Sequence, residues 1–129
     1  MSRLLLDTQA FLWWVTDDAR LSAAARSAIA DPNRTPVLSL ASVWEMAIKA
    51  GIGQLRLTRP VTTFVREQLA ANHFRLLPIE LADFARVEGL PHHHRDPFDR
   101  LLIAQAMQGG FPIVSSDKTL DAYDVVRIG

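Results

Sequence analysis

Residues 4–8 read LLLDT, a run of three leucines that ends in an acid and a threonine. A short, wholly apolar run of this kind is typical of a strand buried on both faces, as in a parallel sheet. Val37-Leu38 and Ile113-Val114 repeat the pattern, and each is followed by a segment with helical signals. Strands that alternate with helices predict right-handed crossovers. We therefore predict an α/β fold: an α/β/α sandwich with a mostly parallel central sheet.

The other predicted elements continue this alternation along the chain. The predicted strands are residues 4–6, 36–39, 74–79, 112–115 and 125–128. The predicted helices are residues 8–16, 21–30, 42–50, 60–72, 81–88 and 98–108, with a helical turn at 117–121. Pro and Gly residues are scattered between these segments, and no linker is long enough to separate two units. We therefore predict a single domain over residues 1–129.

The composition excludes several classes of protein. Fourteen Lys and Arg residues balance fourteen Asp and Glu residues, so the net charge is zero. This balance argues against a general electrostatic nucleic-acid binder, but it allows a local patch or a metal that grips a polyanion. The absence of cysteine excludes disulfides and thiolate metal sites. Asp7 and Gln9 interrupt the apolar N-terminal segment and no run spans a bilayer, so we expect a cytoplasmic protein without a membrane partner.

Five of the fourteen acids fall where predicted strands end or predicted helices begin: Asp7, Glu45, Asp96, Asp99 and Asp117. Open parallel sheets bind ligands beyond the carboxyl ends of their strands. Carboxylates that converge there repel one another unless a cation neutralises them. The cation that prefers such oxygen ligands is Mg²⁺ or Mn²⁺, and its usual work is on phosphoryl oxygens. The pattern therefore predicts a metal site for phosphate chemistry.

Helix capping is the alternative explanation for the same acids. Ser42 to Glu45 fits a capping box, Asp96 fits the N-cap of a helix, and Asp7 and Asp117 fit N-caps as well. Capping does not require an acid at every position, because Ser, Thr and Asn serve equally well. It also gives no reason for an acid directly after three buried leucines. The set as a whole therefore favours the metal site.

Taken together, these local sequences resemble a PIN domain and, within it, the VapC toxins of type II toxin–antitoxin modules. The resemblance lies in Asp7-Thr8, Ser42-Val43-Trp44-Glu45, residues 99–104 (DRLLIA) and Ser115-Ser116-Asp117, and residues 94–100 (HRDPFDR) are like one VapC-type subgroup. It implies a metal-dependent endoribonuclease that hydrolyses RNA phosphodiester bonds. It also implies a cognate VapB-type antitoxin and a homodimer. The RNA that is cut and the choice between Mg²⁺ and Mn²⁺ stay open.

The resemblance assigns roles to individual residues. Asp7, Glu45, Asp99 and Asp117 match the four acids that form the family's catalytic metal site. For Glu45, metal binding and action as a base both remain open. Three accessory residues complete the site: Asp96 caps a helix or supports the metal ligands, Ser115 positions a water, and Thr8 supports Asp7.

Several nearby residues carry weaker predictions. Arg95 and Arg100 either contact RNA phosphates or lie on a solvated helix start, and Lys49 is expected to pair with Glu45 one helical turn away. The three histidines at 92–94 fit an exposed loop better than a metal site.

Three rival functions are weaker. A haloacid-dehalogenase-like phosphatase needs an acid where Gln9 stands, and a response-regulator receiver needs an acidic pair where Asp7 stands alone. A non-catalytic binding protein has no need of all four acids.

Overall fold

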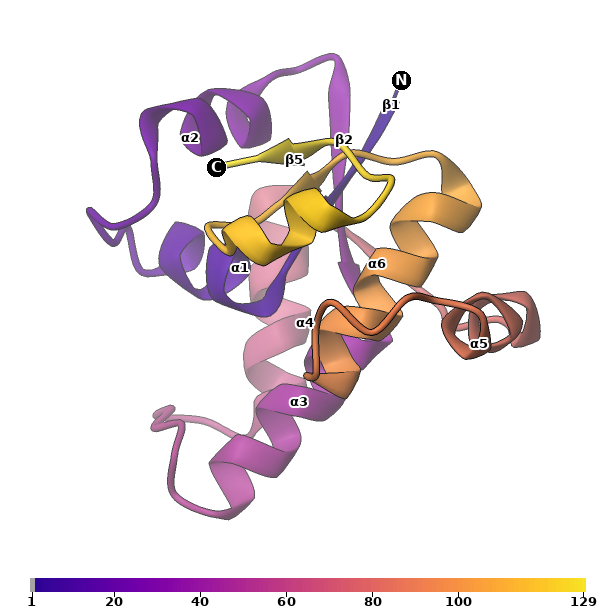
Figure 1. Ribbon diagram of the computed structural model, residues 1–129. Coiled ribbons are helices and arrows are strands. Elements are labelled where there is room, and N and C mark those ends of the chain that lie inside the picture. The colour runs from indigo at the N-terminus through magenta and orange to yellow at the C-terminus, as the bar shows by residue number, and fades with distance from the viewer. Residues whose placement is uncertain (1) are drawn as a thin grey trace.

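The structure, a computed structural model, describes residues 2–129 as five strands, six α-helices and one 3₁₀ helix (Figure 1). The strands are β1 (Ser2–Leu6), β2 (Arg34–Ser39), β3 (Arg75–Leu77), β4 (Ile113–Val114) and β5 (Arg127–Ile128). The helices are α1 (Thr8–Val15), α2 (Ala23–Ala30), α3 (Leu40–Gly51), α4 (Val61–Asn72), α5 (Leu81–Glu88) and α6 (Pro97–Gly109), followed by the 3₁₀ helix η1 (Lys118–Ala122).

The five strands form one sheet in the order β3-β2-β1-β4-β5, and all four pairings are parallel. The central strand β1 places Leu5 opposite Val37 on one side and Ile113 on the other. The predicted parallel sheet and its α/β class are therefore confirmed. The chain moves outward from β1 to β3 in one direction and then returns to β4 on the other side of β1.

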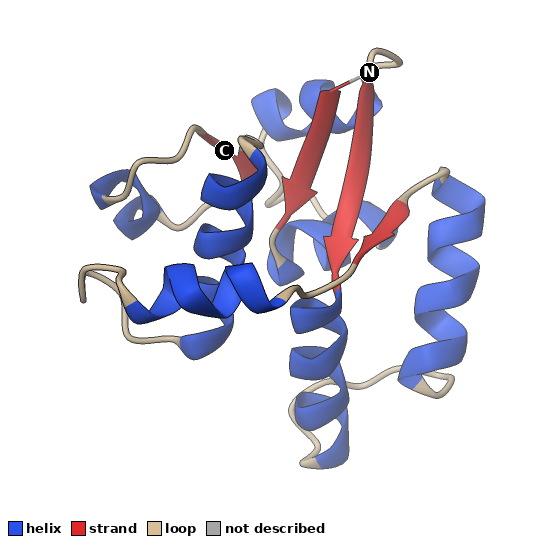
Figure 2. Cartoon of the chain, turned by 90° about the vertical axis from the view of Figure 1, so that its right-hand side faces the viewer, coloured by secondary structure: helices blue, strands red, loops and turns tan. Residues whose placement is uncertain are grey.

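Helices cover both faces of the sheet, as predicted (Figure 2). Successive side chains of a strand point to opposite faces, which separates Leu5 from Leu4 and Leu6. Leu5 packs with buried residues of α6 and η1, whereas Leu4 and Leu6 pack with buried residues of α1, α2 and α4. The run of three leucines is fully buried because it supplies both layers of the core.

The start of α3 differs from the prediction. The helix begins at Leu40 rather than Ser42, because the Ser39 hydroxyl caps it by accepting from the backbone N–H of Ala41 at 3.0 Å. The predicted capping box at Ser42 and Glu45 is therefore wrong. Ser42 is instead buried, and Glu45 lies in the second turn of the helix, where its side chain is free for other contacts.

The strand order creates a switch point between β1 and β4, where the connections from neighbouring strands leave in opposite directions. Crevices that bind ligands form at such points, outside the carboxyl ends of the strands. Asp7 follows β1 directly, and Asp117 follows β4 after two serines. Within residues 2–129, no helix has the length and apolarity that a membrane span requires.

Candidate metal centre

The five predicted acids share one pocket of about 380 Å³ at the carboxyl ends of the strands. Its lining includes Asp7, Glu45, Asp96, Asp99 and Asp117. They come from five different places: the ends of β1 and β4, the middle of α3, the loop before α6 and its first turn. The structure thus brings together residues that lie up to 110 positions apart in the chain, as counted from Asp7 to Asp117.

Asp7 and Asp117 are the acids that follow strands, and Asp7 is the more deeply buried of the two. It is the N-cap of α1, and its Oδ1 accepts from the backbone N–H of Ala10 at 2.7 Å. Burial raises the pKa of the Asp7 carboxyl, while hydrogen bonds from the Ser115 hydroxyl and Ala10 lower it and the charges of Glu45 and Asp117 raise it further. The net pKa lies above its ordinary value, mainly because burial disfavours the charged carboxylate.

Glu45 is held at both carboxylate oxygens. Oε1 is 2.7 Å from the Thr8 hydroxyl, which also bonds Ser42 Oγ at 2.9 Å, and Oε2 is 2.6 Å from Lys49 Nζ. The predicted Lys49–Glu45 pair is confirmed, and the hydrogen bond to Glu45 raises the pKa of Lys49. Thr8 contacts Glu45 rather than Asp7, because α1 turns its first side chain toward α3. The expected support of Asp7 by Thr8 is therefore replaced by support from Ala10 and Ser115.

Asp96 and Asp99 lie together at the start of α6. The Asp96 carboxylate accepts from the backbone N–H groups of Phe98 (2.8 Å) and Asp99 (3.1 Å), so Asp96 caps the helix as predicted. Burial, followed by the negative charges of Asp96 and Asp7, raises the pKa of Asp99 to about 7, against a partial lowering by His94. Asp99 thus resembles Asp7 in having a raised pKa, with burial as the main cause in both.

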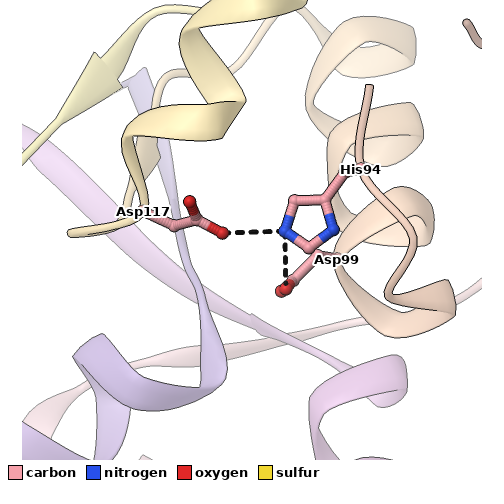
Figure 3. Close-up of side chains that lie close together, drawn as sticks. All are labelled: His94, Asp99 and Asp117. Atoms are coloured by element: carbon pink, nitrogen blue, oxygen red, sulfur yellow. Dashed lines mark hydrogen bonds and ion pairs between the residues drawn. The ribbon is translucent and has the colours of Figure 1, made fainter. Parts of the chain in front are cut away.

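His94 faces the acids, contrary to the expectation of an exposed loop (Figure 3). Its Nε2 lies 2.7 Å from Asp117 Oδ2 and 3.3 Å from Asp99 Oδ2, with 14% of its side chain exposed. Burial raises the pKa of Asp117, but hydrogen bonds from Thr119 and His94 lower it below its ordinary value. The sequence pattern does not single out His94, because the three adjacent histidines look like one exposed segment. Neighbouring loop residues nevertheless point in different directions. The signal that marks it is its place two residues before the capping acid.

Ser115 and the two arginines complete the surroundings. The buried Ser115 hydroxyl accepts from the backbone N–H of Asp117 at 3.0 Å and also bonds Asp7, so it joins two of the acids directly. Arg95 is exposed and stays available for RNA.

Arg100 is not available for RNA. Its guanidinium is buried and donates to the carbonyls of Pro91 (2.9 Å), Val87 (3.3 Å) and Leu90 (3.3 Å). Leu90 and Pro91 lie in the loop before α6, whereas Val87 lies near the end of α5, so these bonds anchor the loop to the helix that precedes it. This anchoring role replaces both predictions for Arg100, the RNA contact and the solvated helix start.

The donor set fits a hard divalent cation. The pocket offers carboxylate oxygens from Asp7, Glu45, Asp99 and Asp117, and carboxylate oxygens of Asp99 and Asp117 lie within 4.8 Å of each other. Burial raises the pKa of Asp7 and of Asp99 most, and repulsion from the neighbouring acids raises both further. A bound cation relieves such repulsion. The pocket is also open to solvent at Asp117, which leaves room for water and substrate.

Comparison with known proteins places this arrangement in a family context. A family model described as PIN domain matches residues 4–126, a span that contains all five acids. Ribonuclease VapC22 of Mycobacterium tuberculosis is 32% identical over 124 residues, covering 95% of this chain and 93% of that protein.

Solved structures share the fold over nearly the whole chain. VapBC2 from Rickettsia felis, bound to a DNA fragment from their promoter, matches with a TM-score of 0.71 at 11% identity, covering 97% of this chain and 96% of that chain. FitAcB from Neisseria gonorrhoeae matches with a TM-score of 0.65 at 18% identity, covering 98% of this chain and 96% of that chain. At these identities the likeness concerns the fold alone.

Proposed function

Because this chain belongs to the PIN domain family and is related to a VapC ribonuclease, we propose that it is a metal-dependent endoribonuclease. It hydrolyses RNA phosphodiester bonds and acts as the toxin of a VapBC-type toxin–antitoxin module. The observation that carries this proposal is the pocket of about 380 Å³ where acids from β1, α3, α6 and the end of β4 meet. All four family acids are present in it.

Asp7, Glu45, Asp99 and Asp117 hold the metal, which is Mg²⁺ or Mn²⁺. When bound, the cation supplies positive charge that neutralises the phosphate and lowers the pKa of a water. The chain's own residues prepare the site for it. Ser115 and Ala10 orient the Asp7 carboxylate, and Thr8 holds Oε1 of Glu45, while Lys49 occupies its Oε2 in the metal-free protein. Asp96 supports Asp99 by fixing the start of α6.

The RNA is expected to enter from the side of the loop before α6. Arg95 is exposed there, next to the capping residue Asp96, and its guanidinium is suited to a phosphate oxygen. The neutral net charge of the chain implies that this contact is local rather than part of a broad basic surface. Replacing Arg95 with Gln is therefore expected to raise KM for RNA and to leave kcat nearly unchanged.

The proposed partners are a cognate VapB-type antitoxin and a second copy of the chain. One surface suited to such contacts is the outer side of α3, where Leu40, Trp44 and Ile48 recur every four residues and are 38%, 59% and 40% exposed. Apolar stripes of this kind commonly mark protein interfaces. Light scattering of the protein alone and with its antitoxin measures both assemblies, and replacing Trp44 with Ser is expected to weaken at least one of them.

The deciding experiment is the cleavage of total RNA by purified, antitoxin-free protein in Mg²⁺, in Mn²⁺ or in EDTA, beside Asp7→Asn protein. Discrete products that require a divalent metal and vanish in the variant support the proposal. Identical products from variant and wild type indicate a contaminating nuclease. No cleavage by a preparation that binds the metal contradicts the ribonuclease assignment for the RNAs tested and favours a role in complex formation alone.

A further inference from the structure

The His94 side chain lies between two acids that come from different parts of the fold (Figure 3). Its Nε2 is 2.7 Å from Asp117 Oδ2 and 3.3 Å from Asp99 Oδ2. Asp117 follows β4 and caps η1, whereas Asp99 belongs to the first turn of α6. One nitrogen atom thus connects the two elements that carry the outer wall of the metal pocket.

The proton on this ring can be located from its other nitrogen. Nδ1 of His94 lies 3.1 Å from the backbone nitrogen of Asp96, which carries a hydrogen and can only donate. Nδ1 therefore acts as the acceptor and has no proton of its own. The neutral ring then carries its proton on Nε2, so that His94 donates to Asp117 Oδ2 and presents the same N–H close to Asp99 Oδ2. A ring in this tautomer has no lone pair on Nε2, which excludes it as a metal ligand through that atom.

The hydrogen bond from His94 goes to Asp117, and Asp99 lies beside the same nitrogen. The carboxylate of Asp117 also accepts from the backbone N–H of Thr119 (3.0 Å) and from its hydroxyl (2.7 Å). Within residues 2–129, His94 Nε2, at 3.3 Å, is the one side-chain nitrogen that forms a close polar contact with the Asp99 carboxylate.

The backbone of His94 is fixed independently of its ring. The Tyr123 hydroxyl accepts from the backbone N–H groups of His93 (3.1 Å) and His94 (2.9 Å) and donates to the Pro91 carbonyl (2.8 Å). The Arg100 guanidinium also holds this loop by donating to the carbonyls of Pro91 and Leu90. The ring is therefore presented to the acids by a built support, and changing the ring leaves that support in place.

We infer that His94 is a positioning residue, whose Nε2–H holds the Asp99 and Asp117 carboxylates in the arrangement that receives the cation. This inference rests on the proposed function of the pocket as a metal centre. Hydrogen-bond donors of this kind orient ligand carboxylates, and their loss typically costs about 10- to 100-fold in metal affinity or activity. His94 thus acts through Asp99 and Asp117 and does not touch the cation.

A pair of substitutions separates the two nitrogens. In His94→Asn the amide oxygen takes the place of Nδ1 and keeps the bond to Asp96, but no donor reaches the acids. In His94→Gln the amide nitrogen takes the place of Nε2 and restores the donor, but the bond to Asp96 is lost. His92→Asn is the matched control, because His92 is exposed in the same loop.

The measurements are Mn²⁺ affinity, followed by the electron paramagnetic resonance signal of free Mn²⁺, and the kcat and KM of RNA cleavage. We expect His94→Asn to weaken Mn²⁺ binding by about 10- to 100-fold and to lower kcat with little change in KM. His94→Gln should recover most of both, and His92→Asn should match the wild type. Equal losses in the Asn and Gln variants, unchanged Mn²⁺ affinity in the Asn variant, or tighter binding there would each overturn the inference.

A third measurement keeps this result apart from the proposed function. Nitrogen NMR of the His94 ring in metal-free protein at neutral pH reports which nitrogen carries the proton. We expect the proton on Nε2, and a proton on Nδ1 overturns the inference whatever the enzyme does. A wild type that binds no Mn²⁺ and cleaves no RNA overturns the metal centre, and with it the positioning role, even when the ring has the expected tautomer.

Discussion

The metal pocket has two unlike halves. The inner acids, Asp7 and Glu45, are 8% and 7% exposed and are held by groups on α1 and α3 and by Ser115, which follows β4. The outer acids, Asp99 and Asp117, have side chains that are 29% and 37% exposed, and both are held by a histidine from a loop. Regular elements thus support one half of the pocket, and the connection between α5 and α6 supports the other.

This difference separates two properties of the site, namely the folding free energy that its buried charges cost and the access that substrate has to its acids. The inner acids lie in the core, so their charge costs folding free energy unless a cation is present. The outer acids face solvent, so the substrate can reach them. We therefore expect both halves to be needed for cleavage, whereas the stability of the metal-free protein should respond mainly to the inner half.

The largest expected effect compares Asp7→Asn with Asp99→Asn. Each removes a proposed metal ligand and should lower RNA cleavage by about 10³-fold or more. Asn still caps α1, so Asp7→Asn removes a buried charge without loss of the cap. The metal-free Asp7→Asn protein should therefore be more stable than wild type by about 1–2 kcal/mol, and Asp99→Asn should gain less because its charge is more exposed. Urea titration in EDTA measures both.

The comparison of halves fails if Asp99→Asn stabilises the metal-free protein as much as Asp7→Asn does. It also fails if either variant keeps cleavage near the level of the wild type. Asp124→Asn is a suitable control, because Asp124 is exposed and lies outside the pocket.

The second prediction concerns pH. The pKa of Asp99 is raised to about 7, and the pKa of Asp7 is raised as well, both from an ordinary value of 3.8. Between about pH 4 and 7 the folded protein therefore binds more protons than the unfolded chain, so its stability falls as pH rises through this window. We expect a loss of about 1–2 kcal/mol in EDTA.

Divalent metal should remove this trend. Mg²⁺ at about 100 times its Kd adds about 2.7 kcal/mol, and it binds best when the acids are deprotonated. Thermal unfolding at several pH values with Mg²⁺ or EDTA measures the difference. A metal-free stability that rises between pH 4 and 7 contradicts the prediction that the buried charges of Asp7 and Asp99 cost folding free energy without metal.

The sequence predicts the place of Asp7 well because local features fix it. Leu4 to Leu6 can only be a buried strand, and the residue after it must lie at the carboxyl end of the sheet. Asp96 likewise announces the start of α6 through its capping position. These inferences need only the nearest residues in the chain, which is why the strands, most helices and the five acids could be placed.

The loop-borne half was harder to predict because its contacts are distant in sequence. His94 meets Asp117 23 residues away, and its backbone is held by Tyr123 29 residues away. Both predictions for Arg100, an RNA contact and a solvated helix start, were wrong because its carbonyl partners lie in a loop whose path no local pattern specifies. The predicted start of α3 was wrong for a similar reason. Ser39 and Ser42 are both possible caps, and the buried contact of Ser42 with Thr8, which is distant in sequence, decides between them.

The third prediction tests how the inner half is held. Thr8→Val keeps the shape of the side chain but removes the hydroxyl that lies 2.7 Å from Glu45 Oε1. We expect a loss of about 1 kcal/mol of stability and a drop of about tenfold in cleavage, because the buried carboxylate loses a donor. Thr8→Ser keeps the hydroxyl and should retain most of both. Equal behaviour of the Val and Ser variants would show that Thr8 contributes packing rather than a hydrogen bond.

The smallest expected effect comes from Lys49, the cation that the inner half already contains. Its Nζ lies 2.6 Å from Glu45 Oε2, with 46% of the side chain exposed, so Lys49→Met should cost the metal-free protein only about 0.5 kcal/mol. The Lys49 ammonium also lies close enough to Asp96 and Asp99 for their charges to act on it. It should therefore repel a second cation that enters the same group of acids. Mg²⁺ should therefore bind Lys49→Met a few-fold more tightly, whereas Lys49→Arg should match the wild type. The loss of metal-free stability and the gain in Mg²⁺ affinity have opposite signs, so thermal unfolding with and without Mg²⁺ separates them. Weaker Mg²⁺ binding by Lys49→Met would mean that Lys49 orients Glu45 rather than competing with the metal.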